Sequence, residues 1–382
     1  MKTGSFFPET VKGIYKCRPN RFIVECIVHD RTSRAYLPNP GRLWELFYPG
    51  VLLYLVKHGA SYEGNTDFTV VAVERDSLPI MLHTHVNNLV ARQLIEQGRI
   101  GGLENSIVIK PEVTIDNSRF DFLLNQNGKD VVVEIKSCTL VGKRIAMFPD
   151  AVTARGTKHL LELAYLAKRG IKTAVVFLVH WPNVDYFLPE HHTDLDFART
   201  LLTVKDKVLV KAVSVEWKSS LILGRTKDLI IPWQLVGQEA HDSGSYLVVM
   251  ELKRNRCLFI GKLGKVKFRK GYYVYVGSAK TALSKRIERH RRLFKKYHWH
   301  VDFLRRALDF HVALPIRASE SLECELAAAL EKIADWEVNK FGSSDCDCKS
   351  HLFGMLENPI QSRAFIDLLL HFRINRLEKF IP

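Results

Sequence analysis

The chain has 382 residues, of which 47% are hydrophobic and 25% are charged, a composition typical of a globular protein with two or three domains. No apolar run reaches the roughly 18 residues that a transmembrane helix needs, and the first residues lack the apolar core of a signal peptide. We therefore expect a cytoplasmic protein whose seven cysteines are reduced thiols.

The formal net charge is +15. From His241 onward the chain carries 26 Lys and Arg against 16 Asp and Glu, so two thirds of the basic excess lies in the last 142 residues. A basic excess favours a polyanionic partner, and the first candidate is nucleic acid, most of all DNA. A solvated basic surface is the alternative, and charge alone does not decide between them.

Residues 1–85 consist of short apolar runs separated by Pro and Gly turns. The runs are Arg21–Val28, Val51–Val56 and Phe68–Val73. This pattern predicts a small β-barrel, and an OB-type barrel would bind single strands through a basic, aromatic face. A structural barrel with scattered surface arginines is the alternative. The candidates for a binding face are Arg18, Arg21, Arg34 and Arg42.

Residues 86–225 have the pattern of an α/β layered core. Val86–Ile100 has the spacing of an amphipathic helix, and Thr173–His180 is the apolar run of a strand buried on both faces. A helix ending at Lys168 is expected to begin at Gly156 or Thr157. The stripe expected on the first helix is Leu89, Val90, Leu94 and Ile95. Further elements are expected at Ile107–Lys110, Asp196–Thr203 and Lys207–Glu216.

One hairpin in this core has a register that can be counted from its turn. Asn127-Gly128 stands between two β-rich runs, which is the strongest short-range signal for a two-residue type I′ turn. Such a turn fixes which residues of the two strands face each other. Counting outward from it, Asp121 faces Glu134.

Two facing carboxylates repel each other unless a positive charge lies between them. Lys136 lies two residues after Glu134, so it points to the same face. Carboxylates bind Mg²⁺ or Mn²⁺ through oxygen, and a metal beside a lysine can activate water and stabilise developing charge. The hairpin therefore predicts a hydrolytic site with a divalent metal held by Asp121 and Glu134. On the following helix, His159 and Glu162 share a face and form either part of this site or a surface pair.

Residues 221–242 have weak periodicity and are expected to be a linker to a second unit, residues 241–382. Gly244–Leu252 and Gly271–Val276 have the composition of strands. Ser284–Tyr297 is expected to be a helix capped by Ser284, with seven Lys or Arg between positions 285 and 296. A phosphate backbone would relieve their repulsion, and a solvated face is the alternative. Together with Arg21 and Arg42, the candidate nucleic-acid contacts are Lys285, Arg289, Arg292 and Lys296.

Residues 1 to about 225 resemble the sugar fermentation stimulation protein family. That resemblance implies an OB-like domain followed by a nuclease-like fold of the PD-(D/E)xK class with DNA-binding activity. It also implies that Asp121 and Glu134 are metal ligands and that Lys136 is the catalytic lysine, in agreement with the register counted above. The matching segments are Arg18–Phe22, Leu37–Leu43, Ser118–Leu123, Val133–Leu140 and Phe148–Leu163.

The second unit resembles a divergent GIY-YIG endonuclease domain. Gly244-Ser245-Tyr246 and Tyr275-Val276-Gly277 stand at the two motifs, with Arg286 and His290 at the family's spacing. The 29 positions between the two tyrosines exceed the usual gap. The resemblance implies that the tyrosines and Arg286 activate water and stabilise charge, and that Glu325 holds one divalent metal. The implied catalytic residues are Tyr246, Tyr275, Arg286, His290 and Glu325.

A short cysteine motif in this unit has two interpretations. Cys346, Cys348 and His351 are potential zinc ligands, with His298 or His300 as a fourth. The C-x-C spacing differs from the common C-x-x-C knuckle, which favours a capped turn with reduced thiols.

Two classes of function remain from the sequence. The first is a metal-dependent deoxyribonuclease with two sites on one chain, and the second is a non-catalytic DNA-binding regulator that keeps nuclease folds. Every residue type that the hairpin site needs is present, which favours the nuclease. The predicted architecture is a multidomain α/β (α+β) protein with an OB-like barrel (1–85), a PD-(D/E)xK core (86–225) and a GIY-YIG-like domain (241–382).

Overall fold

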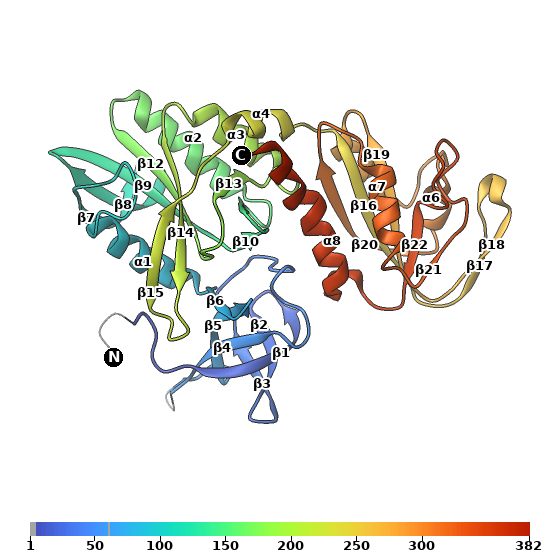
Figure 1. Ribbon diagram of the computed structural model, residues 1–382, viewed down its shortest axis with the longest axis horizontal. Coiled ribbons are helices and arrows are strands. Elements are labelled where there is room, and N and C mark those ends of the chain that lie inside the picture. The colour runs from blue at the N-terminus through green and yellow to red at the C-terminus, as the bar shows by residue number, and fades with distance from the viewer. Residues whose placement is uncertain (1–4, 60–61) are drawn as a thin grey trace. The chain divides into compact units, whose positions relative to one another are not determined.

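The computed structural model describes residues 5–59 and 62–382. The chain forms two compact units (Figure 1). The first comprises Met1–Glu190, Asp196–Val236 and Glu378–Pro382, and the second comprises His191–Leu195 and Gly237–Leu377. Within the described ranges, none of the helices is long and apolar enough to cross a membrane.

A small barrel at the N-terminus confirms the predicted OB-like domain. Its strands follow the order β3-β2-β1-β4-β5-β6, and a parallel pairing of β3 with β5 closes the sheet. Alternate residues such as Val24 and Leu53 are fully buried inside it. The strands are β1 (Val11–Asn20), β2 (Ile23–Val28), β3 (Arg31–Tyr36), β4 (Leu52–Lys57), β5 (Phe68–Arg75) and β6 (Leu78–Met81).

The main sheet in the rest of the first unit is mixed and has six strands, in the order β15-β14-β12-β9-β8-β7. Its strands are β7 (Ser106–Ile115), β8 (Ser118–Gln126), β9 (Lys129–Cys138), β12 (Lys172–Val179), β14 (Leu209–Trp217) and β15 (Leu223–Asp228). A smaller sheet contains β10 (Leu140–Val141), β11 (Ile145–Phe148) and β13 (Tyr186–Pro189).

Helices cover both faces of the six-stranded sheet (Figure 1). Phe177 of β12 belongs to the same hydrophobic cluster as the helix α2 (Ala154–Lys168), whereas its neighbour Val176 belongs to the cluster of the helix α1 (Thr84–Glu96). Because side chains alternate along a strand, both faces of β12 are buried, as its apolar run predicts. The other helix of this unit is α3 (Leu195–Val204), and α4 (Trp233–Glu239) contains the end of this unit at Val236.

The β8–β9 hairpin has the predicted register. Gln126 pairs with Lys129, and the pairing continues outward to Phe122 and Val133. Asn127 and Gly128 have φ angles of 53° and 80°, which are the left-handed values that both central residues of a type I′ turn require.

The second unit is built on a five-stranded sheet in the order β20-β16-β19-β22-β21, with a separate β17–β18 hairpin. Its strands are β16 (Gly244–Leu252), β17 (Arg256–Phe259), β18 (Lys265–Phe268), β19 (Gly271–Ala279), β20 (Asp309–Arg317), β21 (Trp336–Glu337) and β22 (Leu352–Met355). The α-helices are α5 (Leu283–Arg291), α6 (His300–Leu304), α7 (Glu323–Glu331) and α8 (Arg363–Arg373).

Several local predictions were wrong. The expected linker contains β15, which pairs with β14, and α4, because buried Leu235 and Val236 give it a core contact. Of the apolar stripe predicted for α1, Val90, Leu94 and Ile95 are buried as expected. Leu89 is 57% exposed, and Val86 is buried in its place.

The predicted basic helix of the second unit is present, but its cap and its end differ from the prediction. α5 begins after Ala282 and ends at Arg291. Its first turn is capped from outside, by Asp242, whose Oδ1 accepts the backbone N–H of Ser284 at 3.0 Å. Phe294 therefore lies beyond the helix and is 83% exposed.

Candidate active site

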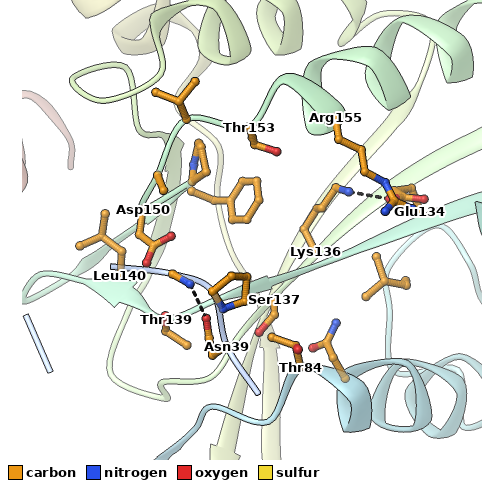
Figure 2. Close-up of a pocket in the computed structure, with 18 of the residues that line it drawn as sticks. Asn39, Thr84, Glu134, Lys136, Ser137, Thr139, Leu140, Asp150, Thr153 and Arg155 are labelled. Carbon is orange, nitrogen blue, oxygen red and sulfur yellow. Dashed lines mark hydrogen bonds and ion pairs between the residues drawn. The ribbon is translucent and has the colours of Figure 1, made fainter. Parts of the chain in front are cut away.

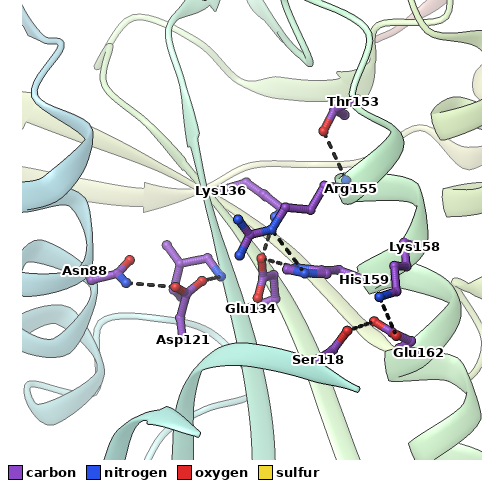
Figure 3. Close-up of polar contacts among 12 residues, drawn as sticks. Asn88, Ser118, Asp121, Glu134, Lys136, Thr153, Arg155, Lys158, His159 and Glu162 are labelled. Atoms are coloured by element: carbon purple, nitrogen blue, oxygen red, sulfur yellow. Dashed lines mark hydrogen bonds and ion pairs between the residues drawn. The ribbon is translucent and has the colours of Figure 1, made fainter. Parts of the chain in front are cut away.

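The hairpin brings Asp121 and Glu134 together on neighbouring strands of the first unit (Figure 3). Oδ2 of Asp121 accepts the backbone N–H of Ile135 at 2.7 Å, so the carboxylate reaches across to β9. Its Oδ1 accepts an N–H of Asn88, from α1, at 2.8 Å. The position of Asp121 is therefore fixed by both β9 and α1.

Glu134 is only 4% exposed, and its two oxygens differ sharply. Oε1 lies 2.5 Å from Nζ of Lys136 and 2.5 Å from Nδ1 of His159. Oε2 is buried and has no hydrogen-bond partner in the part of the chain that the structure describes. An unpartnered buried carboxylate oxygen is costly unless a cation or water occupies its vicinity.

The first turns of α2 supply His159, which contacts Glu134, and Arg155, which contacts His159 (Figure 3). Oγ1 of Thr153 accepts the N–H of Gly156 at 3.0 Å and caps the helix. Nε of Arg155 donates to Nε2 of His159 at 3.4 Å. His159 thus accepts from Arg155 at one ring nitrogen and donates to Glu134 from the other.

Of the two α2 residues weighed from the sequence, only His159 joins the site. Glu162 turns away toward Ser118, whose hydroxyl donates to it, and Lys158, whose Nζ lies 3.6 Å away.

The two facing carboxyl groups have opposite pKa shifts. Burial, followed by the charge of Glu134, raises the pKa of Asp121. Burial also acts against ionisation of Glu134, but the hydrogen bond from His159 and the charge of Lys136 outweigh it and lower the pKa of Glu134. Environments that push apart the pKa values of neighbouring acids are typical of functional sites.

The site opens into a cleft of about 590 Å³ (Figure 2). One wall is the loop after β3, where Asn39 accepts the N–H of Gly41 at 2.9 Å and donates to the carbonyl of Leu82 at 3.1 Å. Arg21 of the barrel and Arg155 of α2 also line it. The cleft therefore presents basic groups beside the carboxylate pair.

These residues fit an oxygen-ligated divalent cation. Glu134 is buried, Asp121 beside it is partly buried, and Oε2 of Glu134 has no competing hydrogen bond among the residues described. Mg²⁺ prefers one or two carboxylates together with waters and substrate oxygens.

A second pocket of about 260 Å³ lies in the second unit and contains both predicted tyrosines and Arg286. The hydroxyl of Tyr246 lies 2.8 Å from Nε2 of His290, and Arg286 donates to the carbonyl of Ser278 at 2.9 Å. Burial raises the pKa of Tyr246 and of Tyr275 and lowers that of His290 to about 3. His290 is therefore a neutral hydrogen-bond partner of Tyr246.

The structure places the predicted metal ligand Glu325 outside this pocket. Glu325 is exposed on α7 and does not line the pocket, whereas Glu323 does. Two residues correspond to about 200° around a helix, so the two side chains point in nearly opposite directions. Glu323 accepts the hydroxyl of Ser278 at 2.5 Å. The acidic side chain that α7 brings into the pocket is therefore Glu323, which the sequence analysis did not select.

Some of the residues predicted to contact nucleic acid are engaged with other side chains of the protein, and the others line the cleft or are exposed. Arg289 is engaged internally, because its guanidinium donates to both carboxylate oxygens of buried Asp302 at 2.9 Å. Arg42 stacks on its neighbour, with Cζ 5.0 Å from the ring centroid of Trp44. Arg21 lines the cleft of the first unit. The exposed candidates on and after α5 are Lys285, Arg292 and Lys296.

Sequence reasoning did not identify Asn88 or Arg155. Both come from helices far from the hairpin in sequence, and polar residues at these positions also suit an exposed helix face. Glu96, the acidic residue of α1, pairs with Arg92 at 2.8 Å.

Family comparisons agree with this architecture. Residues 85–220 match the sugar fermentation stimulation protein RE domain, and residues 17–82 match the SfsA N-terminal OB domain. Residues 245–373 match the domain of unknown function DUF123.

Sugar fermentation stimulation protein homologs are similar to the first half of the chain. The homolog of Methanosphaera stadtmanae is 39% identical over 193 residues, which are 50% of this chain and 80% of the relative. That of Methanothermobacter thermautotrophicus is 34% identical over 201 residues, 53% of this chain and 83% of the relative.

Among solved structures, Pyrococcus furiosus SfsA in complex with Ca²⁺ aligns with a TM-score of 0.55 and 28% identity, covering 60% of this chain and 99% of that one. The chain belongs to the sugar fermentation stimulation protein family and carries a DUF123 domain at its C-terminal end.

Proposed function

We propose that the first unit is a metal-dependent nuclease that hydrolyses phosphodiester bonds of DNA at Asp121, Glu134 and Lys136. The observation that carries this proposal is Oε2 of Glu134, which is buried beside Asp121 without a hydrogen-bond partner among the described residues. A regulator that only bound DNA would have no use for this costly arrangement in the floor of a cleft.

Each residue has a separate task in the proposed reaction. Asp121 and Glu134 hold Mg²⁺ or Mn²⁺, which supplies a Lewis acid and lowers the pKa of water when bound. Lys136 is ion-paired with Glu134 at 2.5 Å. A cation on Glu134 would weaken that pair, and the ammonium group would then orient the attacking water or offset charge on the phosphate.

Two positioning residues complete the site. Asn88 holds Oδ1 of Asp121, and His159 holds Oε1 of Glu134. Such hydrogen bonds orient ligands and keep the other oxygen available. Arg21 and Arg155 in the cleft wall are placed to contact phosphate oxygens.

The Pyrococcus relative supports a divalent ion here, because its structure is a complex with Ca²⁺. Ca²⁺ and Mg²⁺ share a preference for oxygen ligands. Mg²⁺ or Mn²⁺ is proposed for catalysis because Mg²⁺ keeps a stricter coordination geometry than Ca²⁺ around a reacting phosphate.

The DUF123 domain has a second candidate site for the same chemistry. Tyr246 and Tyr275 face Arg286 and Glu323 in one pocket. In this proposal Glu323 holds the metal and Arg286 stabilises charge on the phosphate. The raised pKa of both tyrosines disfavours their ionised forms, so the first unit is the stronger candidate.

A cleavage panel tests this proposal. Supercoiled plasmid, single-stranded DNA and RNA are incubated with wild type, Glu134→Ala and Glu323→Ala, in Mg²⁺, Mn²⁺ or a chelator. Cleavage of DNA that requires metal and disappears only in Glu134→Ala supports the assignment to the first unit. Loss only in Glu323→Ala moves the activity to the second unit. Binding of DNA by wild type without cleavage under any condition establishes the non-catalytic alternative.

A further inference from the structure

Three cysteines and a histidine converge in the second unit from two distant segments. Cys324 lies in the first turn of α7, while Cys346, Cys348 and His351 lie in the chain that leads from β21 into β22. Their potential ligand atoms all lie within 4.8 Å of one another. The C-x-C motif therefore gains a third thiol that its local spacing does not reveal.

We propose that Cys324, Cys346, Cys348 and His351 bind a structural zinc ion. A set of three thiolates and one imidazole satisfies the four positions of tetrahedral zinc. The softness of thiolate ligands favours zinc over Mg²⁺, Mn²⁺ or Ca²⁺. This proposal concerns the second unit and does not depend on catalysis at Glu134.

His351 is oriented as a ligand of such a site would be. Its ring is 2% exposed, and Nε2 lies 3.4 Å from Sγ of Cys346. Nδ1, on the other side, lies 3.4 Å from Oε1 of Glu323. Metal-bound histidines commonly direct their second nitrogen to a carboxylate, which fixes the tautomer. Glu323 is thereby linked both to His351 and to the neighbouring pocket.

The sequence suggested His298 or His300 as the fourth ligand, but neither histidine belongs to this cluster. Nδ1 of His300 accepts the N–H of Gly342 at 3.1 Å, and both histidines line the pocket with the tyrosines. Cys324 takes the fourth position because α7 packs against β22.

The segment between β21 and β22 gives the ion a structural purpose. Residues 338–351 contain only turns and bends, and a loop this long needs side-chain or metal contacts to hold one conformation. Gly342, Ser344 and Asp345 of this segment line the pocket with Tyr275. Fixing the segment to α7 would therefore fix one wall of that pocket.

Zinc content of the full-length protein tests the proposal. Wild type and the control Cys257→Ser, whose cysteine is exposed on β17 outside the cluster, should purify with one zinc per chain. Cys324→Ser and Cys348→Ser should bind zinc at least about 100-fold more weakly, because loss of even a supporting residue costs about 10–100-fold. Glu323→Gln, which removes only the supporting charge, should weaken binding by about 10-fold.

Cobalt substitution of wild type keeps the test informative if a variant does not fold. Thiolate-to-cobalt charge transfer and intense tetrahedral d–d bands are expected, and competing zinc should abolish them. The proposal is overturned if wild type binds no zinc with its thiols reduced, if Cys324→Ser keeps full affinity, or if peptide mapping finds two of these cysteines in a disulfide.

Discussion

Glu134 uses one oxygen for two hydrogen bonds and leaves the other unpartnered among the described residues. This asymmetry suits the proposed metal site and differs from an ordinary buried ion pair, in which both oxygens are satisfied. Asp121 completes the arrangement from the adjacent strand through its contact with the N–H of Ile135. The two acids, held by β8 and β9, define where the cation would bind.

The raised pKa of Asp121 predicts how metal binding depends on pH. Because burial and Glu134 raise this pKa above the ordinary value, Asp121 protonates at a higher pH than the usual Asp, near 3.9. The affinity for Mn²⁺ should fall by up to about tenfold per pH unit below the shifted pKa. Calorimetric titration of wild type and Asp121→Asn at a series of pH values measures this. An affinity that stays constant down to about pH 4 would contradict it.

Glu45, in the loop between β3 and β4, predicts a pH effect on stability. Burial and the charge of Asp150 raise the pKa of Glu45 to about 8, against about 4.3 in the unfolded chain. The folded state therefore binds this proton more tightly, and the resulting stabilisation is lost as the pH rises toward 8.

Replacing Glu45 with Gln removes this pH-dependent loss. The melting temperature of Glu45→Gln relative to wild type should rise from about pH 4.5 upward and level off above about 8. Glu9→Gln, at an exposed position of the same unit, is the control. A difference that is independent of pH would show that folding does not raise the pKa of Glu45.

Residues brought together by local geometry were predictable from the sequence. Asp121 and Glu134 face each other because Asn127-Gly128 fixes the hairpin register. Asn88 and His159 reach the same point from α1 and α2, and their approach depends on how the helices pack across the sheet. No local pattern encodes that packing.

Helix boundaries show the same limit at the scale of elements. α5 ends at Arg291 even though its basic pattern continues to Lys296, because Asp302 draws Arg289 and Lys295 into a buried ionic cluster. Charge periodicity predicted a longer helix, and the partner that ends it comes from α6. Likewise, the face of α7 that packs on the sheet determines that Glu323, and not Glu325, points into the pocket.

The N-cap of α2 should contribute measurably to stability. Thr153 accepts the N–H of Gly156 at 3.0 Å, so Thr153→Ala should cost about 1 kcal/mol and lower the melting temperature by about 2–4 °C. Thr203→Ala, at an exposed position near the end of α3, is the matched control. Equal melting temperatures for the two variants would show that the cap does not stabilise α2.

At the scale of the whole molecule, the net charge of +15 predicts DNA binding that weakens steeply with salt. The logarithm of the binding constant should fall linearly with the logarithm of salt concentration, by about 0.9 per phosphate contact. Arg21→Ala, in the cleft wall, should reduce the slope by about one.

Arg169→Ala provides the control for this measurement, because Arg169 lies at the end of α2 and pairs with Asp116 at 3.0 Å. Its slope should equal that of wild type. Fluorescence anisotropy of a labelled duplex over a range of salt concentrations measures both variants. An unchanged slope for Arg21→Ala would place the DNA away from this cleft.

The most direct test of the nuclease assignment is the rate of metal-dependent DNA cleavage by Glu134→Gln, a change that keeps the size of the side chain but removes its charge. We expect the first-order rate to fall at least about 10²–10³-fold relative to wild type. Glu162→Gln, on α2 but turned toward Ser118, should cut at nearly the wild-type rate. Equal rates for Glu134→Gln and wild type would contradict the assignment of catalysis to this hairpin.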